Sequence, residues 1–306
     1  MTFVAFGERL VSDPKDLNGH ALGMKGSPNR DDVLDRRARN ILGECLCAPY
    51  GPDRDMIQIF SLNGICEVRS GSDLPTLLAD ALDAAGVVPR TGDVLVVTQK
   101  IVSKAEDRFV DLAAVSPGAR ALELATSTGK DPRLVELVLR ESRNVVRAAP
   151  NVLITRHRTG HVMANAGIDR SNIGEGSEDR AILLPMDADA SAARLYAALV
   201  SRFAEPPAVV ISDSFGRPWR YGVVNVAIGV AGMPSLIDRR GELDRDGRVL
   251  EVTQVAMGDM IATAAGLATG EGAESVPAVL VRGVAWPPGD RPAADLVRSL
   301  SEDLFQ

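Results

Sequence analysis

The chain has 306 residues, of which 45% are hydrophobic, 25% are charged and only 4% are aromatic. This composition is typical of a globular protein whose core consists of Ala, Val, Leu and Ile, and the length suggests about two domains. The net charge of −7 argues against a nucleic-acid-binding protein, which usually carries a basic balance.

Membrane and secretion signals are absent from the sequence. No apolar stretch approaches the ~20 residues of a membrane span. The N-terminus lacks a basic segment followed by a long apolar run, so it is a poor signal peptide. Cys45, Cys47 and Cys66 have no spacing of a disulfide framework and indicate reduced thiols, hence a cytoplasmic protein.

Residues 1–55 differ in composition from the remainder, with charged stretches interrupted by Gly and Pro, such as GSPNRDDVLDRRARN. We expect an N-terminal extension that is poorly ordered, and an upstream extension before a natural start near Met56 is the alternative. Residues 56–306 are predicted to form the body of the protein, with a division into two subdomains left open.

Regular structure is predicted to begin with a strand in the alternating segment IQIFSLNGI. A helix follows, with Ser72 or Asp73 as its N-cap and Gly86 as its stop. Residues 93–98 form a short, nearly continuous apolar run that is typical of a buried strand. The polar segment QKIVSKAEDR comes directly after it.

The second part of the chain alternates predicted helices and strands. Helical periodicity covers 119–144, with a break near Gly129 and Pro132, and 151–169 predict two strands that meet at a Thr159-Gly160 turn. The later elements are a helix over 191–203, a buried strand over 207–212, an apolar glycine-rich segment over 225–232, a helix over 252–268 and a strand over 276–284. The fold class is therefore α+β or mixed α/β, with mixed sheets and flanking helices.

Polar segments follow several of these elements, at the positions where α/β folds usually bind ligands. Lys100 and Lys104 lie just past a buried strand and suit nucleotide phosphates, with solvated surface lysines as an equal alternative. In NAGIDRSN, Asp169 offers hard oxygen ligands for Mg²⁺ or Mn²⁺, with Asn172 in reach. A simple Asx turn is the favoured alternative there.

The segment SDSFGRPWRYG carries the strongest functional signal. A buried strand delivers Asp213 and Ser214 as adjacent oxygen donors. A turn at Gly216 and Pro218 is predicted to place two arginines where they grip phosphate or carboxylate as bidentate forks. A structural Asp–Arg pair covered by the tryptophan is the alternative.

The loop GEGAES offers Glu271 as a metal ligand and its amides as phosphate contacts, although a plain αβ loop is the likelier interpretation of this segment alone. There is no Walker A motif and no GxGxxG after a strand, so the common nucleotide-binding folds are excluded by motif. Only three histidines are present, which argues against a His-rich zinc site.

Together, DVLVVTQKIVSKAEDR, NAGIDRSN, SDSFGRPWR with GVVNVAIGVAG, GRVLEVTQVA and GEGAESVPAVLVRG resemble the coenzyme F420-0:L-glutamate ligase family. The resemblance covers about residues 57–285, in the same order and with similar spacing. It implies a γ-glutamyl ligase catalytic region over 56–306 and an intertwined homodimer. It also implies a reaction in which GTP phosphorylates a carboxylate of the deazaflavin coenzyme precursor before L-glutamate attacks, with Mg²⁺ or Mn²⁺ and, as a further candidate, K⁺.

The resemblance also assigns residues by position. A metal cluster is implied at Asp169, Asp213, Ser214 and Glu271. Nucleotide contacts are implied at Ile65, Cys66, Glu67, Val68, Gln99, Lys100, Lys104, Asn172, Thr269, Gly270, Glu271, Gly272, Ala273, Glu274, Ser275 and Val276. We assign catalytic roles to Asp213, Arg217 and Arg220, with the arginines orienting an anionic substrate or stabilising an oxyanion.

Three departures from the family pattern limit these assignments. Gln99-Lys100 replaces Ser-Thr or Ser-Lys, Asp107 replaces a glycine, and residues 1–55 have no counterpart. A related ligase for a different acid and a non-catalytic nucleotide-binding partner in cofactor biosynthesis are therefore the alternatives. Retention of all three acidic residues of the cluster favours an enzyme.

Overall fold

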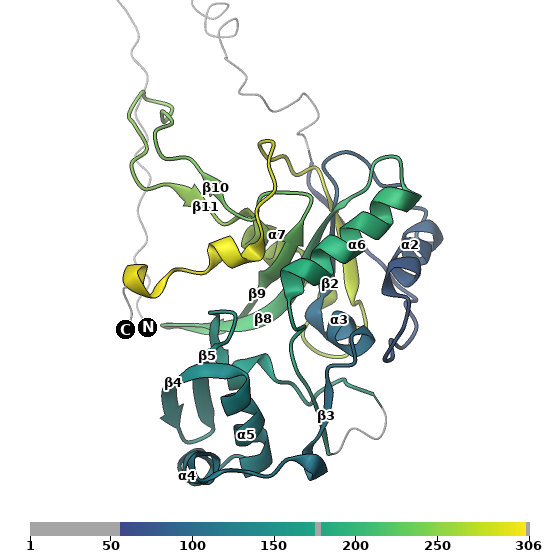
Figure 1. The fold of residues 1–306 in the computed structure, drawn as a ribbon. Helices are drawn as coiled ribbons and strands as arrows, with labels where there is room; N and C mark the ends of the chain where they lie inside the picture. The colour runs from purple at the N-terminus through teal and green to yellow at the C-terminus, as the bar shows by residue number, and fades with distance from the viewer. Residues whose placement is uncertain (1–55, 175–178, 304–306) are drawn as a thin grey trace, which may run out of the picture. The chain divides into compact units, whose positions relative to one another are not determined.

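The computed structural model describes residues 56–174 and 179–303, all within the unit Pro49–Gln306. The expectations for residues 1–55, including Cys45 and Cys47, lie outside these residues. At the centre is a five-stranded sheet of order β1-β12-β2-β8-β9 (Figure 1). Its strands are β1 (Gln58–Ser61), β2 (Val94–Thr98), β8 (Ala208–Arg217), β9 (Arg220–Ala231) and β12 (Ala278–Arg282). Only β2 and β8 pair in parallel within it, which confirms the mixed sheet of an α+β fold.

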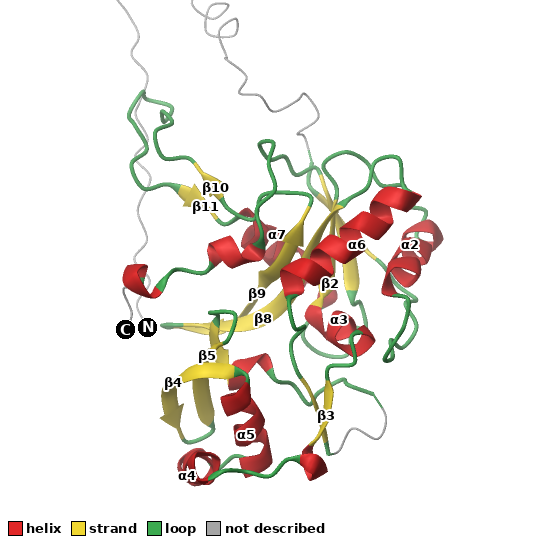
Figure 2. Ribbon diagram, viewed as in Figure 1, coloured by secondary structure: helices red, strands yellow, loops and turns green. Residues whose placement is uncertain are grey.

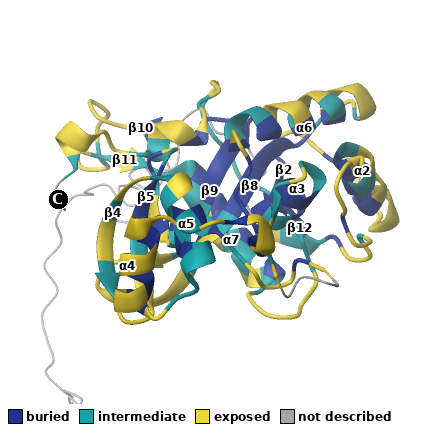
Figure 3. Cartoon of the chain, turned by 60° about the horizontal axis from the view of Figure 1, so that its bottom comes forward, coloured by how far each residue is buried: buried dark blue, intermediate teal, exposed yellow. Residues whose placement is uncertain are grey.

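Helices cover both faces of this sheet (Figures 1 and 3). Because successive side chains of a strand point to opposite faces, Val97 and Val209 pack with α2 and α6, whereas Val96 and Val210 pack with α7. The alternation buries β2 and the first half of β8 on both sides, so residues 94–97 and 208–211 are continuous apolar runs. The covering helices are α2 (Leu74–Ala84), α3 (Gln99–Ala105), α6 (Ala188–Arg202) and α7 (Met257–Thr269).

A further cluster of buried side chains lies between a three-stranded sheet and two helices. Figure 2 shows α5 beside β4 and β5. Its elements are α4 (Ala119–Thr128), α5 (Pro132–Arg140), β4 (Ser142–Ala149), β5 (Val152–His157) and β6 (Val162–Ala164). Two strand pairs complete the fold: β3 (Phe109–Asp111) with β7 (Arg180–Ile182), and β10 (Ile237–Asp238) with β11 (Gln254–Val255). No helix in the described ranges is long and apolar enough to cross a bilayer.

Local signals placed several helix ends and turns correctly. Asp73 caps α2, and its carboxylate accepts the backbone N–H of Thr76. Gly129 ends α4 in the left-handed conformation at φ 70°, and α5 begins at Pro132. The Thr159-Gly160 turn joins the antiparallel strands β5 and β6. Each of these signals acts within a few residues, so sequence alone is sufficient to locate it.

Other boundaries were wrong. The helix predicted to reach residue 144 ends at Arg140, because the next segment pairs with β5 as β4. The first seven residues of the polar segment QKIVSKAEDR form α3, a helix that was not predicted, and Ile101 and Val102 are its buried apolar residues. The last helix begins at Met257, five residues later than predicted, since Val252 is 84% exposed and lies outside any helix.

The strand predicted over 207–212 is also longer than expected. β8 continues to Arg217, so Gly216 lies within the strand and the chain turns at Pro218 and Trp219. Pairing with β9 sustains the extension, and Ser214 lies opposite Asn225. The glycine-rich segment 225–232 lies largely in β9 and is mostly buried within one chain, so it carries no argument for an interface.

A homodimer remains a prediction. The tip of the β8–β9 hairpin exposes Tyr221 fully and Val223 by 47%, and apolar surface of this kind favours contact with a second copy. Light scattering should give a mass twice the 32.5 kDa of one chain. Tyr221→Glu should halve that mass, while Leu243→Glu, an exposed residue elsewhere, should leave it unchanged. A wild-type mass of 32.5 kDa would rule out the dimer.

Candidate active site

The parallel pairing of β2 and β8 ends with Thr98 opposite Ser212, and β8 continues beyond it to Arg217. A cavity of about 780 Å³ opens at the carboxyl end of β2, where open α/β sheets usually bind ligands. Its size falls within the roughly 300–1,000 Å³ of small-molecule sites. The lining residues are Ile65, Cys66, Glu67, Val68, Thr98, Gln99, Lys100, Ile101, Lys104, Asp169, Ser171, Asn172, Ile173, Gly174, Ser212, Asp213, Ser214, Asn225, Thr269, Gly270, Glu271, Gly272, Ala273, Ser275, Val276 and Pro277.

Asp213 is the most perturbed acid of this cavity. Burial raises its pKa to about 7, and the negative charges of Asp169 and Glu271 add to the effect. The backbone N–H of Ser214 donates to its Oδ1 at 2.9 Å, and the charge of Lys100 also favours the ionised form. These two favourable contacts are outweighed by burial and by the neighbouring acids, so ionisation of Asp213 is opposed in the absence of an added positive charge.

Asp169 is held in place by an Asx turn. Its Oδ1 accepts the backbone N–H groups of Arg170 and Ser171 at 2.6 and 2.8 Å, and Lys100 Nζ lies 2.7 Å from its Oδ2. Burial alone would raise the pKa of Asp169, but the hydrogen bonds from Lys100 and Ser171 outweigh it and hold the pKa below its ordinary value. The turn that we gave as the alternative to a functional role is thus present, and it directs the carboxylate into the cavity.

Lys104 carries a nearly buried positive charge. It is 4% exposed on α3, and its Nζ pairs with Glu67 of the loop after β1. The side chain of Glu67 is 56% exposed, so water can solvate its carboxylate if the ion pair with Lys104 breaks. Lys104 is therefore positioned to exchange this partner for an incoming anion such as a phosphate.

The loop after α7 forms another part of the cavity wall. The Glu274 carboxylate folds back to accept the backbone N–H of Gly272 at 2.7 Å, and Asn172 Nδ2 donates to the carbonyl of Gly272 at 3.2 Å. Gly270 is required where the helix ends, because φ is 66° and a Cβ there would lie 2.2 Å from Glu274 Cδ. The loop is thus tied to the segment that carries Asp169.

Comparison with known proteins assigns this arrangement to a family. A family model described as F420-0:Gamma-glutamyl ligase matches residues 64–283. A coenzyme F420:L-glutamate ligase of Methanothermobacter thermautotrophicus is 43% identical over 230 residues, covering 75% of this chain and 90% of that protein. The chain belongs to this family. Proteins of the same name from Methanopyrus kandleri and Natronomonas pharaonis are 43% and 44% identical, covering 78% and 81% of this chain and 94% and 93% of theirs.

Family membership makes the chain a ligase, and it agrees with the grouping of the cavity residues. Every residue to which the resemblance assigned a metal or nucleotide contact lines the cavity, with the exception of Glu274. The carboxylate of Glu274 instead holds the loop backbone at Gly272. Segments separated by up to about 200 residues of chain thus meet at one strand edge, as the resemblance implies.

The donor set is chemically suited to divalent cations. Asp169, Asp213, Ser214 and Glu271 supply the hard oxygen atoms that Mg²⁺ and Mn²⁺ prefer. Among residues 56–174 and 179–303, no three His, Cys, Asp or Glu side chains already form an ion-binding group. Ionisation of Asp213 is opposed by burial and by two neighbouring acids, and a bound cation would relieve this. Ser212 Oγ is buried without a hydrogen-bond partner, and the ligands of such a cation would supply one.

Arg217 and Arg220 lie away from this cavity. They are paired across the end of the β8–β9 hairpin, and Arg217 Nη2 donates to the carbonyl of Tyr221 at 3.3 Å. Neither arginine lines the cavity. The cause is the longer β8, since a strand advances about 3.3 Å per residue and carries Arg217 four residues past Asp213.

Sequence reasoning assigned no role to four polar residues of the lining, Thr98, Ser171, Ser212 and Asn225. Ser171 closes the Asx turn of Asp169, and Ser212 and Asn225 line the cavity beside Asp213 and Ser214. Ser171 carried a local signal, because a hydroxyl two residues after an Asp commonly joins such a turn. Asn225 carried none, since its place depends on the register that sets it opposite Ser214.

Proposed function

We propose that the protein ligates L-glutamate to the carboxylate of coenzyme F420-0, with GTP as the phosphoryl donor and an acyl phosphate as the intermediate. The observation that carries this proposal is the meeting of Asp169, Asp213 and Glu271 with the buried Lys104 in one cavity. The relatives named coenzyme F420:L-glutamate ligase support the substrates. The cavity supports the nucleotide, because its lysines suit phosphate groups and its acids suit the divalent cations that accompany them.

The reaction has two steps. A carboxylate oxygen of the acceptor attacks the γ-phosphorus of GTP, and the bond to the bridging oxygen breaks as GDP leaves with the electron pair. The amine of glutamate then attacks the acyl carbon, loses a proton and displaces inorganic phosphate. Phosphorylation is required because a free carboxylate has no adequate leaving group. Both steps are favoured by holding the reactants in line at short distance.

The residues divide this work by charge. Lys104, Asn172 and the Gly270–Gly272 backbone are proposed to bind the nucleotide phosphates. Asp169, Asp213, Ser214 and Glu271 are proposed to hold Mg²⁺ or Mn²⁺. When bound, these ions supply charge neutralisation for the transferred phosphoryl group. The Glu274 carboxylate orders this loop by accepting the Gly272 N–H, and the Gly270 N–H donates to the carbonyl of Gly266. The amide of Glu271 is therefore the one in this loop that is proposed to meet a phosphate oxygen.

Oxygen-18 transfer tests the intermediate. Acceptor labelled at both oxygens of its carboxylate should transfer one labelled oxygen to the released phosphate in each turnover. The second labelled oxygen should remain in the amide carbonyl. Excess chelator should stop both product and labelled phosphate, and Mn²⁺ should restore them. Amide formation with unlabelled phosphate would contradict the acyl phosphate.

Residues 1–55 are predicted to be dispensable for this activity. The family match begins at residue 64, and the site is built from residues after 64. Deletion up to Asp55 should leave the specific activity within a few fold of the full chain, measured as amide product per unit of folded protein. Complete loss of activity in a folded deletion variant would show that the segment completes the active site.

A further inference from the structure

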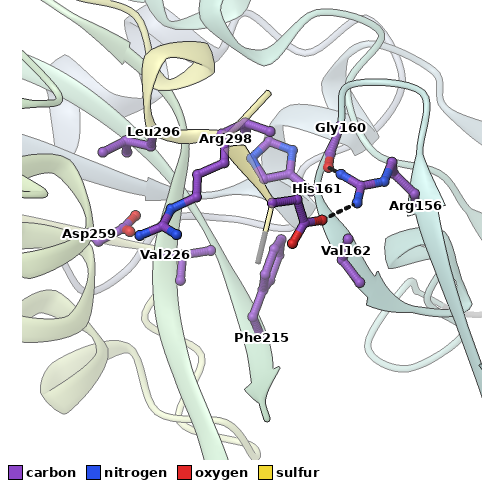
Figure 4. Close-up of a pocket in the computed structure, with 11 residues that line it drawn as sticks. Arg156, Gly160, His161, Val162, Phe215, Val226, Asp259, Leu296 and Arg298 are labelled. Atoms are coloured by element: carbon purple, nitrogen blue, oxygen red, sulfur yellow. Dashed lines mark hydrogen bonds and ion pairs between the residues drawn. The ribbon is translucent and has the colours of Figure 1, made fainter. Parts of the chain in front are cut away.

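A second cavity, of about 260 Å³, lies at the free edge of β9 (Figure 4). The β5–β6 turn, the β8–β9 hairpin, the first turn of α7 and the segment after residue 295 surround it. Phe215, Val226 and Leu296 supply an apolar lining. The volume suits a small metabolite and is too small for a nucleotide, which needs the larger cavity.

The two cavities are adjacent through the register of β8 and β9. Val226 lines the second cavity and lies directly opposite Asp213, which lines the first. Its neighbour Asn225 lines the first cavity. Opposed residues of an antiparallel pair have Cβ atoms roughly 4.5–5.5 Å apart. A ligand in the second cavity is therefore separated from the acids of the first by about one side chain.

Charges of both signs line the second cavity. Asp259 Oδ1 accepts the backbone N–H of Ala227 at 2.9 Å, and no hydrogen bond to a described residue engages Oδ2. Arg298 has no hydrogen-bond or ion-pair partner among the described residues, and its side chain extends toward Asp259 (Figure 4). Arg156 is already paired with Asp303 at 2.6 Å. One carboxylate oxygen and one guanidinium are thus available to a ligand.

His161 contributes a hydrogen-bond acceptor, as its hydrogen-bond network indicates. The backbone N–H of Thr159 donates to His157 Nδ1, so that nitrogen accepts, and His157 Nε2 faces Glu141. The Thr159 hydroxyl then donates to His157 Nδ1 and accepts from His161 Nδ1–H, at 2.7 and 2.9 Å. This tautomer leaves the lone pair on His161 Nε2. Burial lowers the pKa of His161 to about 4, so the ring is neutral.

We propose that the second cavity is the binding site for L-glutamate. The ammonium group is recognised by Asp259 and His161, a carboxylate by Arg298, and the methylene groups by Phe215 and Val226. L-glutamate carries one ammonium group and two carboxylates, so it supplies a cation for Asp259 and an anion for Arg298. A polyphosphate or phosphodiester supplies no cation and would meet the carboxylates of Asp259 and Asp303 without compensation. This inference rests on the proposed function, and it places the amine donor beside the cavity where the acyl group is activated.

Steady-state kinetics of Arg298→Gln test the site. The KM for L-glutamate should rise about ten- to hundredfold, the usual effect of losing a hydrogen bond to a charged group. The KM values for GTP and for the acceptor should stay within about twofold, and kcat should change little, because the larger cavity is intact. Arg245→Gln, which removes the same charge from a side chain 94% exposed, is the matched control and should resemble wild type.

Two further variants keep the site testable if Arg298→Gln fails to fold. Asp259→Asn keeps an oxygen acceptor for Ala227 while removing the charge, and Val162→Phe fills the cavity from a position 41% exposed. Both should raise the glutamate KM selectively. Unchanged glutamate KM values in all three active variants, or a rise confined to the acceptor, would overturn the assignment and leave the ligase function standing.

A binding measurement separates this inference from the proposed function. Saturation-transfer NMR of L-glutamate, with Mg²⁺ and a non-hydrolysable GTP analogue present, should detect saturable binding to wild type and to Arg245→Gln. The signal should be lost in Arg298→Gln. Binding of this pattern without any amide product would support the site and refute the ligase reaction. Absence of saturable binding to wild type would refute the site.

Discussion

Asp213→Asn should abolish ligase turnover while making the ion-free protein more resistant to heat. Activity should fall by at least about a thousandfold, the scale on which charge-stabilising groups act in phosphoryl transfer. The gain in stability follows from the environment of the carboxylate, which burial and the charges of Asp169 and Glu271 oppose. A neutral amide of the same shape removes the buried charge together with its repulsion, so the melting temperature should rise by a few degrees.

The sign of the pH dependence distinguishes this explanation from a general packing effect. The folded carboxyl of Asp213 has a pKa of about 7 against 3.8 for an ordinary Asp, so the folded state binds the proton more tightly. Asp213 therefore lowers the stability of the wild type progressively as pH rises from about 4 to about 7. The stabilisation by Asp213→Asn should be larger at pH 8 than at pH 5, when measured by calorimetry with chelator.

Asp246→Asn is the control for this pair of measurements, since its side chain is 72% exposed in a turn. It should change neither activity nor the pH dependence of the melting temperature. An Asp213→Asn protein that keeps wild-type turnover would remove Asp213 from the catalytic site. A variant that melts lower than wild type at pH 8 would refute the repulsion.

Lys104→Met should raise the KM for GTP about ten- to hundredfold, because it removes a charge-assisted contact to phosphate. Folding should be little affected, since methionine fills a similar volume and the partner Glu67 is already half exposed. The measurement is the nucleotide KM at saturating glutamate and acceptor, together with direct nucleotide binding. Lys130→Met removes the same charge at a position outside the cavity and should bind nucleotide normally.

A nucleotide affinity within about twofold of wild type in Lys104→Met would assign Lys104 a purely structural role with Glu67. That outcome would leave Asn172 and the 269–276 loop as the nucleotide contacts. It would also leave the acid cluster unaffected, because Asp169 takes its ion pair from Lys100.

The sequence was sufficient to predict the apolar runs that lead into the cavity and the polar side chains that follow them. Residues 94–97 of β2 and 208–211 of β8 are apolar without interruption, and this pattern alone placed Lys100 and Asp213 shortly after them. That both ends lie at one edge depends on parallel pairing across about 114 residues of chain, from Thr98 to Ser212. Motif resemblance supplied this information where periodicity did not.

The length of β8 was beyond local reasoning for a physical reason. Gly216 and Pro218 are turn-forming residues, yet only the second lies in the turn, because nine cross-strand pairs with β9 hold Gly216 extended. Tertiary pairing thus overrides a local preference. Arg217 and Arg220 were placed near the acids on the assumption of an early turn, and the longer strand separates them from the cavity.

Asp107 shows how a departure from the family pattern acquires a structural meaning. Its φ is 56°, in the left-handed region that favours glycine, directly after the end of α3. The glycine of the family pattern is thus explained by the backbone, and Asp is among the residues that tolerate this conformation. The substitution lies outside the cavity, so it carries no inference about substrate choice.

The most direct test of the central claim is the mass of the acceptor after incubation with the full chain, L-glutamate, GTP and Mn²⁺. We predict that coenzyme F420-0 gains one or more glutamyl residues, and that Asp213→Asn protein leaves it unchanged. Omission of GTP or addition of excess chelator should also prevent the gain. An acceptor that stays unmodified while GTP is hydrolysed, or glutamylation that persists in Asp213→Asn, would contradict the account.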